Sequence, residues 1–370
     1  MKILAFTRYS YLGPSSRYRF YNYEECFEKH NIKMTIKPLF SKAYFNAPNK
    51  MIKLFVVFFS YLQRVLSVCQ LLIFKNKYDL LLLQYELFPY FPSIFEYLLH
   101  KRGIKYIVDY DDPIFHNYDM NRNKIIQILL RNKIAKVISY ADRVIVCNKY
   151  LESYAEMYNE YTFRLPTVVF LNKYKKVMKT YQKPNNSMFV IGWIGSRTTS
   201  IYILEILPAI QKFVNTYEKI RVDLVGFDSD LLSKEEASRY HLNIIEWSEE
   251  KEIEDILNFD IGIMPLSDDS WSRGKCGFKL IQYMSCKKPV IASPVGMNSV
   301  LIKNGKNGFL AKNLDEWFSA FERLYLDEKL REKIAADNFN KIELEYNHEK
   351  NCKKYIDLLT STIRHKEKAG

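Results

Sequence analysis

The sequence predicts an α/β protein made of two doubly wound, Rossmann-like domains that face each other across a cleft. Short apolar runs of strand length alternate with longer mixed segments of helix length along the chain. Such alternation is typical of parallel sheets that carry helices on both faces. The pattern stops at a polar, basic stretch that ends in Pro-Asn-Asn-Ser and then restarts. A chain of 370 residues is long enough for two cores.

The first half is expected to form a domain over residues 1–171, followed by a linker over residues 172–187. Six apolar runs in this half read as strands: residues 2–7, 32–37, 79–84, 104–109, 143–147 and 167–170. Three intervening segments are long enough for helices: residues 16–29, 91–102 and 123–140.

The second half is expected to form a domain over residues 188–345. Its predicted strands are residues 189–195, 220–226, 242–247, 259–265 and 289–293, and its predicted helices include residues 249–257 and 275–286. We expect residues 346–370 to form a C-terminal helix that crosses back to the first domain.

Composition indicates a soluble globular protein, with 48% hydrophobic and 26% charged residues. Six cysteines are scattered without a CxxC pair, which argues against a zinc ribbon or a disulfide scaffold and predicts reduced thiols in a cytosol. Neither GxxxxGK[ST] nor GxGxxG occurs, which disfavours P-loop NTPases and dinucleotide oxidoreductases.

Positive charge is concentrated in the first half. Residues 1–180 hold 28 Lys and Arg against 14 Asp and Glu, within a total net charge of +13. A basic half suggests an anionic partner, either nucleic acid or an acidic membrane leaflet. No nucleic-acid-binding signature is present, so we expect no nucleic-acid partner.

Residues 51–74 form the one apolar segment long enough to cross a bilayer, but Arg64 lies near its middle. Lys53, Ser60, Arg64 and Ser67 would lie on one narrow helical stripe. Two interpretations remain open: a mostly buried domain helix, which we favour, or an amphipathic helix in the lipid headgroup region.

Three loops that follow predicted strands in the second half combine glycine with polar or basic residues. WIGSRTTS contains Gly195 and Arg197, SPVGMN contains Gly296, and GKCGFK contains Lys275 and Lys279. Ligands of open α/β sheets bind beyond the carboxyl ends of strands, and helix N-termini suit anions. The three loops together predict a phosphate site.

The helix expected over residues 275–286 would carry Lys275, Lys279 and Gln282 on one polar face. Asp268 and Asp269 resemble a metal-binding pair, but a solvated loop after a strand explains them better. We therefore expect no metal site and no cofactor.

Post-strand loops of the first half hold further candidates. They could contact an acceptor or an anion across the cleft, or take a proton from an acceptor hydroxyl. An Asp before Pro is also an ordinary turn or helix-cap device. The candidates are Gly13, Arg17, Arg19, Glu86, Asp111, Asp112 and His116.

Three segments in fixed order resemble glycosyltransferase family 4, also called group 1, which has the GT-B fold. The segments lie within about residues 190–312 and are WIGSRTTSIYILEILPAI, FDIGIMPLSDDSWSRGKCGFKLIQYMSCKKPVIASPVGMNSVL and NGKNGFLAKN. The resemblance is weaker over the first half. It implies transfer of a sugar from a nucleotide-sugar to an acceptor, with retention at the anomeric carbon and without a bound metal.

The resemblance also implies roles for single residues. Arg197 and Lys279 would contact the diphosphate, and Gln282 occupies the place of the second of two family glutamates, which holds the ribose. Gly274 stands where the first, sugar-holding glutamate is expected, so that contact is missing. Further donor contacts would come from the loops just named and from the loop after residues 242–247: Gly195, Ser196, Trp247, Glu250, Lys275, Gly296 and Asn298.

We therefore expect a retaining, metal-independent glycosyltransferase in which Lys279, Arg197, Asp111 and Asp112 carry the chemistry. Its acceptor would be a glycan or a lipid-linked intermediate of bacterial surface polysaccharide synthesis. Its location would be cytoplasmic, with peripheral contact to the inner face of the membrane. Two alternatives stay open: a GT-B nucleotide-sugar epimerase, which needs no acceptor, and a catalytically lapsed nucleotide-sugar-binding protein.

Overall fold

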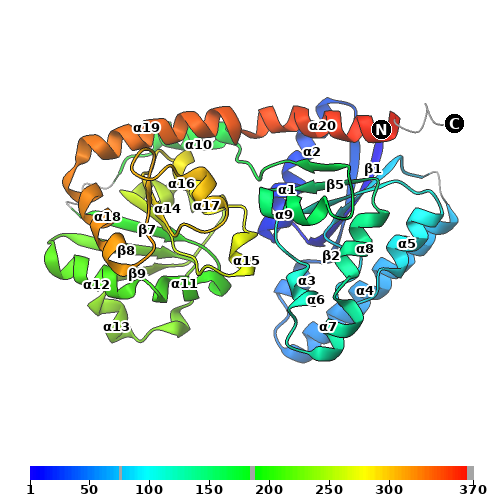
Figure 1. Cartoon of the computed structure of the whole chain (residues 1–370), viewed down its shortest axis with the longest axis horizontal. Coiled ribbons are helices and arrows are strands. Elements are labelled where there is room, and N and C mark those ends of the chain that lie inside the picture. Colours follow the sequence, from blue (N-terminus) through cyan, green and yellow to red (C-terminus); the bar gives the residue numbers. More distant parts are fainter. Residues whose placement is uncertain (75–76, 184–187, 365–370) are drawn as a thin grey trace. The chain divides into compact units, whose positions relative to one another are not determined.

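A computed structural model describes residues 1–74, 77–183 and 188–364 of the chain (Figure 1). The chain divides into two compact units, each built around its own parallel sheet. The first unit comprises Met1–Thr167 and Glu349–Gly370, and the second comprises Val168–His348. The predicted α/β class with two doubly wound parallel sheets is confirmed.

The sheet of the first unit has the strand order β2-β1-β3-β4-β5-β6, and all of its pairings are parallel. The strands are β1 (Lys2–Tyr9), β2 (Lys33–Phe40), β3 (Leu80–Gln84), β4 (Tyr106–Tyr110), β5 (Arg143–Val146) and β6 (Thr162–Arg164). The order reverses between β1 and β3, so the loops after these two strands diverge and leave room for side chains.

Helices connect these strands. They are α1 (Pro14–Arg19), η1 (Tyr21–Tyr23), α2 (Glu24–Lys29), α3 (Lys42–Phe45), α4 (Lys50–Ile73), α5 (Ile94–Lys101), α6 (His116–Asp119), α7 (Lys124–Leu130), α8 (Lys133–Tyr140), α9 (Lys149–Ala155) and α20 (His348–Arg364). The helix predicted over residues 16–29 is divided into α1, η1 and α2, and the one over residues 123–140 into α7 and α8.

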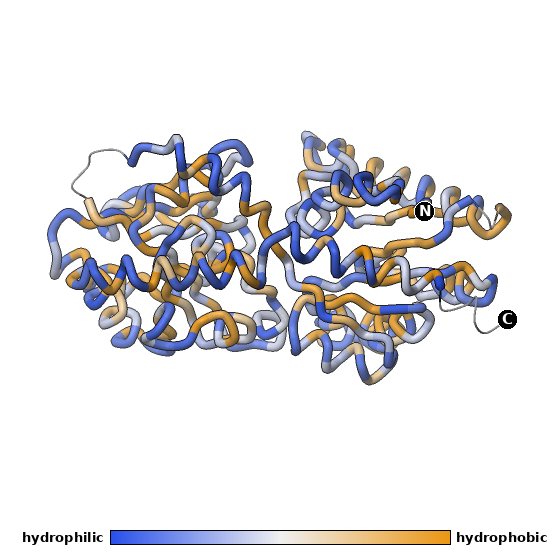
Figure 2. Tube along the Cα trace, turned by 90° about the horizontal axis from the view of Figure 1, so that it is seen from above, coloured by the Kyte–Doolittle hydropathy of each residue, from blue (hydrophilic) through white to orange (hydrophobic). Residues whose placement is uncertain are grey.

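The sheet of the second unit has the order β12-β11-β10-β7-β8-β9, again with parallel pairing only. Its strands are β7 (Phe189–Ile194), β8 (Ile220–Val225), β9 (Leu242–Ile245), β10 (Ile261–Met264), β11 (Val290–Ala292) and β12 (Phe309–Leu310). The order reverses between β7 and β10. Every residue of β7 and β10 is buried, as expected for strands covered on both faces. Hydrophobic and hydrophilic stretches alternate along the trace (Figure 2).

The second unit has helices on both sides of its sheet (Figure 1). They are α10 (Leu171–Thr180), η2 (Arg197–Thr199), α11 (Ile201–Leu204), α12 (Leu207–Thr216), η3 (Ser229–Leu231), α13 (Lys234–Arg239), α14 (Glu252–Asn258), α15 (Ser270–Arg273), α16 (Phe278–Ser285), α17 (Met297–Leu301), α18 (Leu314–Leu326) and α19 (Glu328–Glu345). Trp193, Phe213 and Phe321 lie fully buried in the core between this sheet and α12 and α18.

Three predicted elements differ from the structure. Residues 167–170 form no strand; only Val169 bridges to Asn347, and the sixth strand is β6 instead. Residues 172–180 of the proposed linker belong to α10, which begins at Leu171, and residues 184–187 lie outside the described residues. The helix predicted from residue 275 begins at Phe278, because Gly277 adopts the left-handed conformation at φ +68° and interrupts the helical path.

The prediction that residues 51–74 form a mostly buried helix is wrong. α4 is the one helix among the described residues that is long and apolar enough to cross a membrane, yet only 22% of its most apolar window is buried. Arg64, Val68 and Leu71 are its buried residues.

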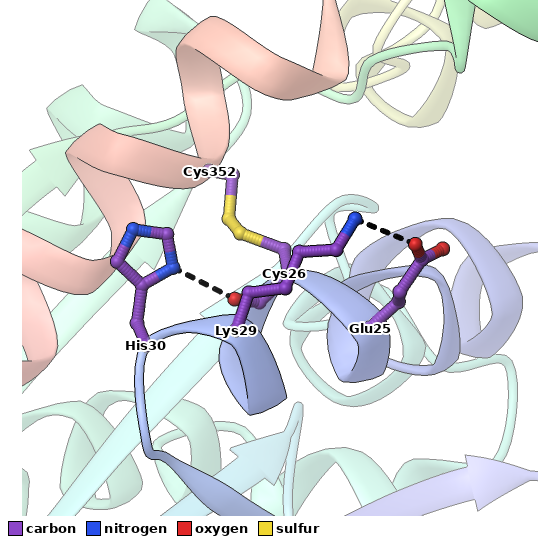
Figure 3. Close-up of a disulfide and its surroundings, with 5 residues drawn as sticks. All are labelled: Glu25, Cys26, Lys29, His30 and Cys352. Atoms are coloured by element: carbon purple, nitrogen blue, oxygen red, sulfur yellow. Dashed lines mark hydrogen bonds and ion pairs between the residues drawn. A yellow bond between two sulfur atoms is a disulfide. The ribbon is translucent and has the colours of Figure 1, made fainter.

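α20 packs within the first unit. Tyr355 lies against Tyr23 and Phe27, with ring centroids 5.0 and 5.3 Å apart, and Cys352 forms a disulfide with Cys26 of α2 (Figure 3). The expectation of reduced thiols throughout is therefore contradicted. The two cysteines are 326 residues apart in sequence, so no spacing pattern could have indicated the pair.

Candidate functional site

Three loops meet at the carboxyl ends of β7, β8 and β9 in the second unit. Gly226 follows β8 with φ +74°, and a side chain there would come 2.3 Å from the Gly195 carbonyl oxygen and 3.2 Å from Trp247 Cβ. The backbone of the β8 loop can therefore approach the β7 loop only because residue 226 has no side chain. This places Gly195 and Trp247, both predicted site residues, on either side of Gly226.

The β7 loop also touches α16, which follows β10. A side chain at Gly195 would come 2.3 Å from the Trp193 ring and 2.9 Å from Lys279 Nζ. Glycine at 195 thus leaves the space into which the Lys279 ammonium group extends.

Lys279 lies in the first turn of α16 and is partly buried. Its ammonium donates a hydrogen bond to Thr199 Oγ1 at 3.1 Å and lies 4.5 Å from the Trp193 ring centroid. No carboxylate of the described residues forms an ion pair with it. Burial, with a smaller effect from the Lys275 charge, lowers the Lys279 pKa to about 7. A bound anion would supply the negative charge that no carboxylate of the described residues places beside Lys279.

The η2 turn frames this position from the β7 side. The Ser196 N–H donates to Thr199 Oγ1 at 3.2 Å, and the Thr199 hydroxyl donates to Ser196 O at 2.9 Å. These bonds fix the hydroxyl that receives the Lys279 hydrogen bond. Arg197 projects from the same turn with a side chain that is 74% exposed, and it approaches only Asp228 loosely, at 3.9 Å.

The loop after β11 holds two further predicted site residues. Gly296 has φ +50°, and a side chain there would come 2.5 Å from the Arg273 carbonyl oxygen. Asn298 is buried in α17, and its amide donates to Ser293 O at 3.1 Å. Its Oδ1 atom has no hydrogen-bond partner among the described residues, which leaves a buried acceptor unsatisfied.

Other residues predicted to bind the nucleotide-sugar differ in their burial and contacts. Gln282 is buried one turn after Lys279 on α16. Lys275 precedes α16, so the predicted common helical face of Lys275, Lys279 and Gln282 is wrong. Trp247 donates from Nε1 to Glu252 at 3.1 Å, whereas Glu250 lies exposed in the following turn.

Two first-unit candidates are held in buried ion pairs, which argues against the ligand-binding roles predicted for them. Arg19 donates to both Asp109 oxygens, at 2.9 and 2.6 Å, and to Leu165 O at 2.8 Å. Glu86 receives hydrogen bonds from Lys133 and from the Tyr118 hydroxyl. Both side chains are satisfied inside the unit and are not available to a ligand.

Asp111, at the end of β4, accepts a hydrogen bond from the Tyr85 hydroxyl, and Asp112 beside it is half-buried. Tyr85 follows β3 with φ +66°, an uncommon conformation for a residue with a side chain. Strained backbone of this kind gathers at functional loops. Asp111 and Asp112 remain candidates for the acceptor side.

His116 is held at both ring nitrogens, 3.0 Å from Asp119 Oδ1 and 2.8 Å from the Tyr150 hydroxyl. Asp119 also lines a cavity of about 480 Å³, together with Gln127, Ile128, Arg131, Asn132, Tyr154 and Tyr158. No sequence pattern indicates this cavity, because its lining comes from α6, α7, the turn between α7 and α8, and the segment around α9.

Two further first-unit candidates have packing roles. A side chain at Gly13 would come 2.5 Å from Tyr9 Cβ, so the residue allows close packing between the first loop and β1. Arg17 is buried, with its guanidinium 5.5 Å from the Tyr11 ring centroid.

Thr199, Trp193 and Gly226 were missed by sequence reasoning, although each touches the Lys279 position or its loops. Gly226 follows a predicted strand and could have been found by the same rule that selected Gly195 and Gly296.

Asp268 pairs with Arg273 at 2.7 Å and Asp269 caps α15 through the Ser272 N–H, also at 2.7 Å. No group of three or more metal-ligating side chains occurs among the described residues.

Residues 187–327 match the family of Glycosyl transferases group 1. The match lies entirely within the second unit. The matched region contains every loop around Lys279. No curated protein matches the sequence.

Solved structures of low sequence identity resemble the chain over most of its length. Sucrose-phosphate synthase from Thermosynechococcus elongatus is 14% identical with a TM-score of 0.69, and 98% of each chain is covered. Anabaena HepE in complex with UDP is 13% identical with a TM-score of 0.67, covering 98% of this chain and 100% of HepE. Staphylococcus aureus TarM is 14% identical with a TM-score of 0.56, covering 79% of this chain and 58% of TarM. The fold is GT-B.

Proposed function

We propose that this chain is a retaining, metal-independent glycosyltransferase that moves a sugar from a nucleotide-sugar to a glycan or lipid-linked acceptor. The observation that carries the proposal is Lys279, a partly buried ammonium at the start of α16 beside the Gly195 loop, with no carboxylate partner among the described residues. A diphosphate is the anion that fits a position between a helix start and the carboxyl ends of parallel strands.

Lys279 suits the leaving group of this reaction. As the bond between the anomeric carbon and the phosphate oxygen breaks, negative charge grows on the diphosphate. An ammonium already fixed by Thr199 and shielded from water by Trp193 meets that charge without reorganisation. Arg197, exposed on η2, can close on the same diphosphate from solvent.

These two cations replace a metal ion in the proposed mechanism, because they can neutralise a diphosphate that otherwise needs Mg²⁺ or Mn²⁺. Asn298 Oδ1 and Gln282, both buried in the second unit, are proposed to receive hydroxyl groups of the nucleotide-sugar. Trp247 is proposed to line the base end of the donor site. The structural likeness to HepE bound to UDP favours testing uridine nucleotides first.

The acceptor is proposed to bind the first unit, near Asp111, Asp112 and the cavity lined by Tyr154 and Tyr158. Tyrosine rings with neighbouring Asp and Arg side chains suit a sugar ring, which needs both stacking and hydrogen bonds. We propose a role in surface polysaccharide synthesis at the cytoplasmic face of the membrane.

A panel of nucleotide-sugars, scored for release of nucleoside diphosphate with and without candidate acceptors, tests this function. Lys279→Ala should lower turnover by about 100- to 1000-fold, the usual cost of removing one preorganised group. Lys288→Ala is the matched control. Burial also lowers the pKa of Lys288, to about 8, but this lysine precedes β11 and its Nζ donates to the Leu257 carbonyl oxygen in α14.

Three outcomes separate the possible functions. Transfer supports the proposal, whereas an epimerised product without transfer indicates a sugar epimerase. Binding without either product indicates a lapsed binding protein, which the glycine at position 274 makes the main competitor.

A further inference from the structure

α4 turns its polar stripe toward the protein. Arg64 is buried, and its guanidinium donates to Thr7 O at 2.9 Å and to Lys37 O at 3.0 Å, at β1 and β2. Ser67 accepts a hydrogen bond from Lys37 Nζ at 3.2 Å, and Tyr61 donates to Pro89 O at 2.9 Å. The helix is therefore attached to the protein through these polar contacts together with the buried side chains of Val68 and Leu71, while most of its apolar residues face away from the core.

The other side of α4 is apolar and exposed. Phe55 and Phe58 have 61% and 62% of their surface exposed. The exposed apolar residues along the helix, at helical spacing, are Met51, Ile52, Leu54, Phe55, Phe58, Phe59, Leu62, Leu66, Ile73 and, just after its end, Phe74. We call this set the α4 apolar face. Contiguous apolar surface of this length marks a binding site rather than ordinary scatter.

The neighbouring loop extends the α4 apolar face. Tyr61 lies 6.0 Å from Phe88, and Phe88 lies 6.2 Å from Phe91, measured between ring centroids. Phe91 and Ile94 are both exposed, 42% and 50% respectively. The apolar surface thus passes from α4 to the start of α5.

The charge around this surface has one sign. The sequence from Lys29 to Tyr78 contains eight lysines, one arginine, and neither Asp nor Glu. Lys50 and Lys77 are exposed at opposite ends of α4. An apolar face with cations at both ends complements a surface that is apolar within and negative at its edge, as an anionic lipid leaflet is.

We propose that the α4 apolar face inserts into the headgroup region of an anionic leaflet, with the helix axis in the plane of the membrane. Arg64 excludes a spanning orientation, because it would have to leave two backbone carbonyls and enter hydrocarbon. The phenylalanines enter the acyl boundary, while lysines at the helix ends contact lipid phosphates. The inference rests on α4 alone and is independent of the donor chemistry.

Co-sedimentation of the full chain with vesicles tests this. Vesicles of phosphatidylcholine with about one-third phosphatidylglycerol should bind the protein, and binding should weaken as salt rises. Phosphatidylcholine alone should bind at least about tenfold less. Equal binding to both vesicles, or none to either, would overturn the proposal.

The variant Phe55→Ser/Phe58→Ser should reduce vesicle binding by at least about tenfold, because both side chains lose apolar area that enters the membrane. The matched control is Leu326→Ser/Leu344→Ser, which changes two side chains exposed to 66% and 67% in the second unit and should leave binding unchanged. Diphosphate binding by the second unit should be unaffected in both variants, so failure here is distinguishable from failure of the proposed function.

Sedimentation velocity decides between lipid and a second copy of the chain. The wild type should be monomeric without vesicles. A dimer that dissociates in Phe55→Ser/Phe58→Ser, with no vesicle binding by the wild type, would assign the α4 apolar face to self-association and overturn the lipid proposal.

Discussion

Replacing Lys279 with methionine should stabilise the ligand-free protein while weakening diphosphate binding. Methionine keeps most of the volume and the unbranched shape of lysine but carries no charge. The folded protein holds the Lys279 pKa at about 7, whereas the side chain has a pKa near 10.5 when unfolded. Folding therefore disfavours the protonated form of this side chain.

The size of the effect follows from that shift. One pKa unit is worth about 1.4 kcal/mol, so the shift sets a ceiling of roughly 5 kcal/mol on the cost of the charge. Lys279 is only partly buried, and solvent screening reduces this to about 1–2 kcal/mol. For a unit of this size, such a gain raises the Tm by about 2–8 °C.

The pH dependence has a definite sign. Between pH 7 and 10.5 the unfolded chain binds more protons at Lys279 than the folded chain does, so wild-type stability rises with pH in that window. The advantage of Lys279→Met should be largest below pH 7 and should disappear near pH 10.5. Thermal unfolding of both proteins at pH 6, 8 and 9.5, with and without UDP, measures this.

UDP should raise the Tm of the wild type at pH 6 much more than that of Lys279→Met. Lys279→Arg, which stays charged, should retain UDP binding at pH 9 better than the wild type. A Lys279→Met variant that is less stable at pH 6, or that gains as much stability from UDP as the wild type, would refute the reasoning.

Three further predictions concern metal, a buried pair and the disulfide. Nucleoside diphosphate release should survive EDTA; complete loss that manganese restores would mean that an ion takes part. Arg19→Met should lower the free energy of unfolding by about 3–5 kcal/mol, because it leaves a buried carboxylate without a partner, while UDP affinity stays unchanged. A destabilised variant with equally weakened UDP binding would contradict this separation. Without reductant, Cys26 and Cys352 should resist alkylation in the unfolded protein while Cys69 reacts, and reduction should lower stability by about 2–4 kcal/mol. Mass spectrometry that finds all three thiols alkylated before reduction would show that the bond is absent.

The sequence predicted most strands correctly because strands buried on both faces appear as continuous apolar runs. β3 and β4 are of this kind, and every residue in them is buried. β6 was not predicted, because it is a three-residue edge strand with Phe163 and Arg164 exposed and therefore has no continuous apolar run. Residues 167–170 were predicted to form a strand because three of the four are apolar. In the structure only Val169 makes a bridge, to Asn347, so the segment is mostly buried without strand pairing.

Hydrophobic periodicity identified α4 but not its orientation. A stripe of polar residues shows that a helix has two different sides, and it does not show which side faces the protein. Arg64 decided the orientation because Thr7 and Lys37 present carbonyl oxygens at the sheet edge. Those partners are 57 and 27 residues away, and local sequence carries no trace of them.

The same limit applies to the first-unit site candidates. Arg19 and Glu86 were both expected in ligand-facing loops because charged residues follow strands there, and Asp109 was expected only as the end of a strand. Arg19 is paired with Asp109, 90 residues away, and Glu86 is paired with Lys133, 47 residues away. Strand ends could be predicted from sequence, but the pairing of charges beyond them depends on the fold.

Partners of the buried cations distinguish a ligand site from a structural one. Arg19 has a carboxylate and Arg64 has backbone carbonyls, so the positive charge of each is satisfied by the protein. Lys288 also has a carbonyl, that of Leu257. Lys279 has three N–H donors and, among the described residues, one hydroxyl and one aromatic face to receive them. Burying a cation with too few hydrogen-bond acceptors costs free energy of folding. A protein retains such a cation where function requires it. Because this cation lies beside the Gly195 loop at the carboxyl end of β7, we propose the diphosphate of a bound donor as the compensating group.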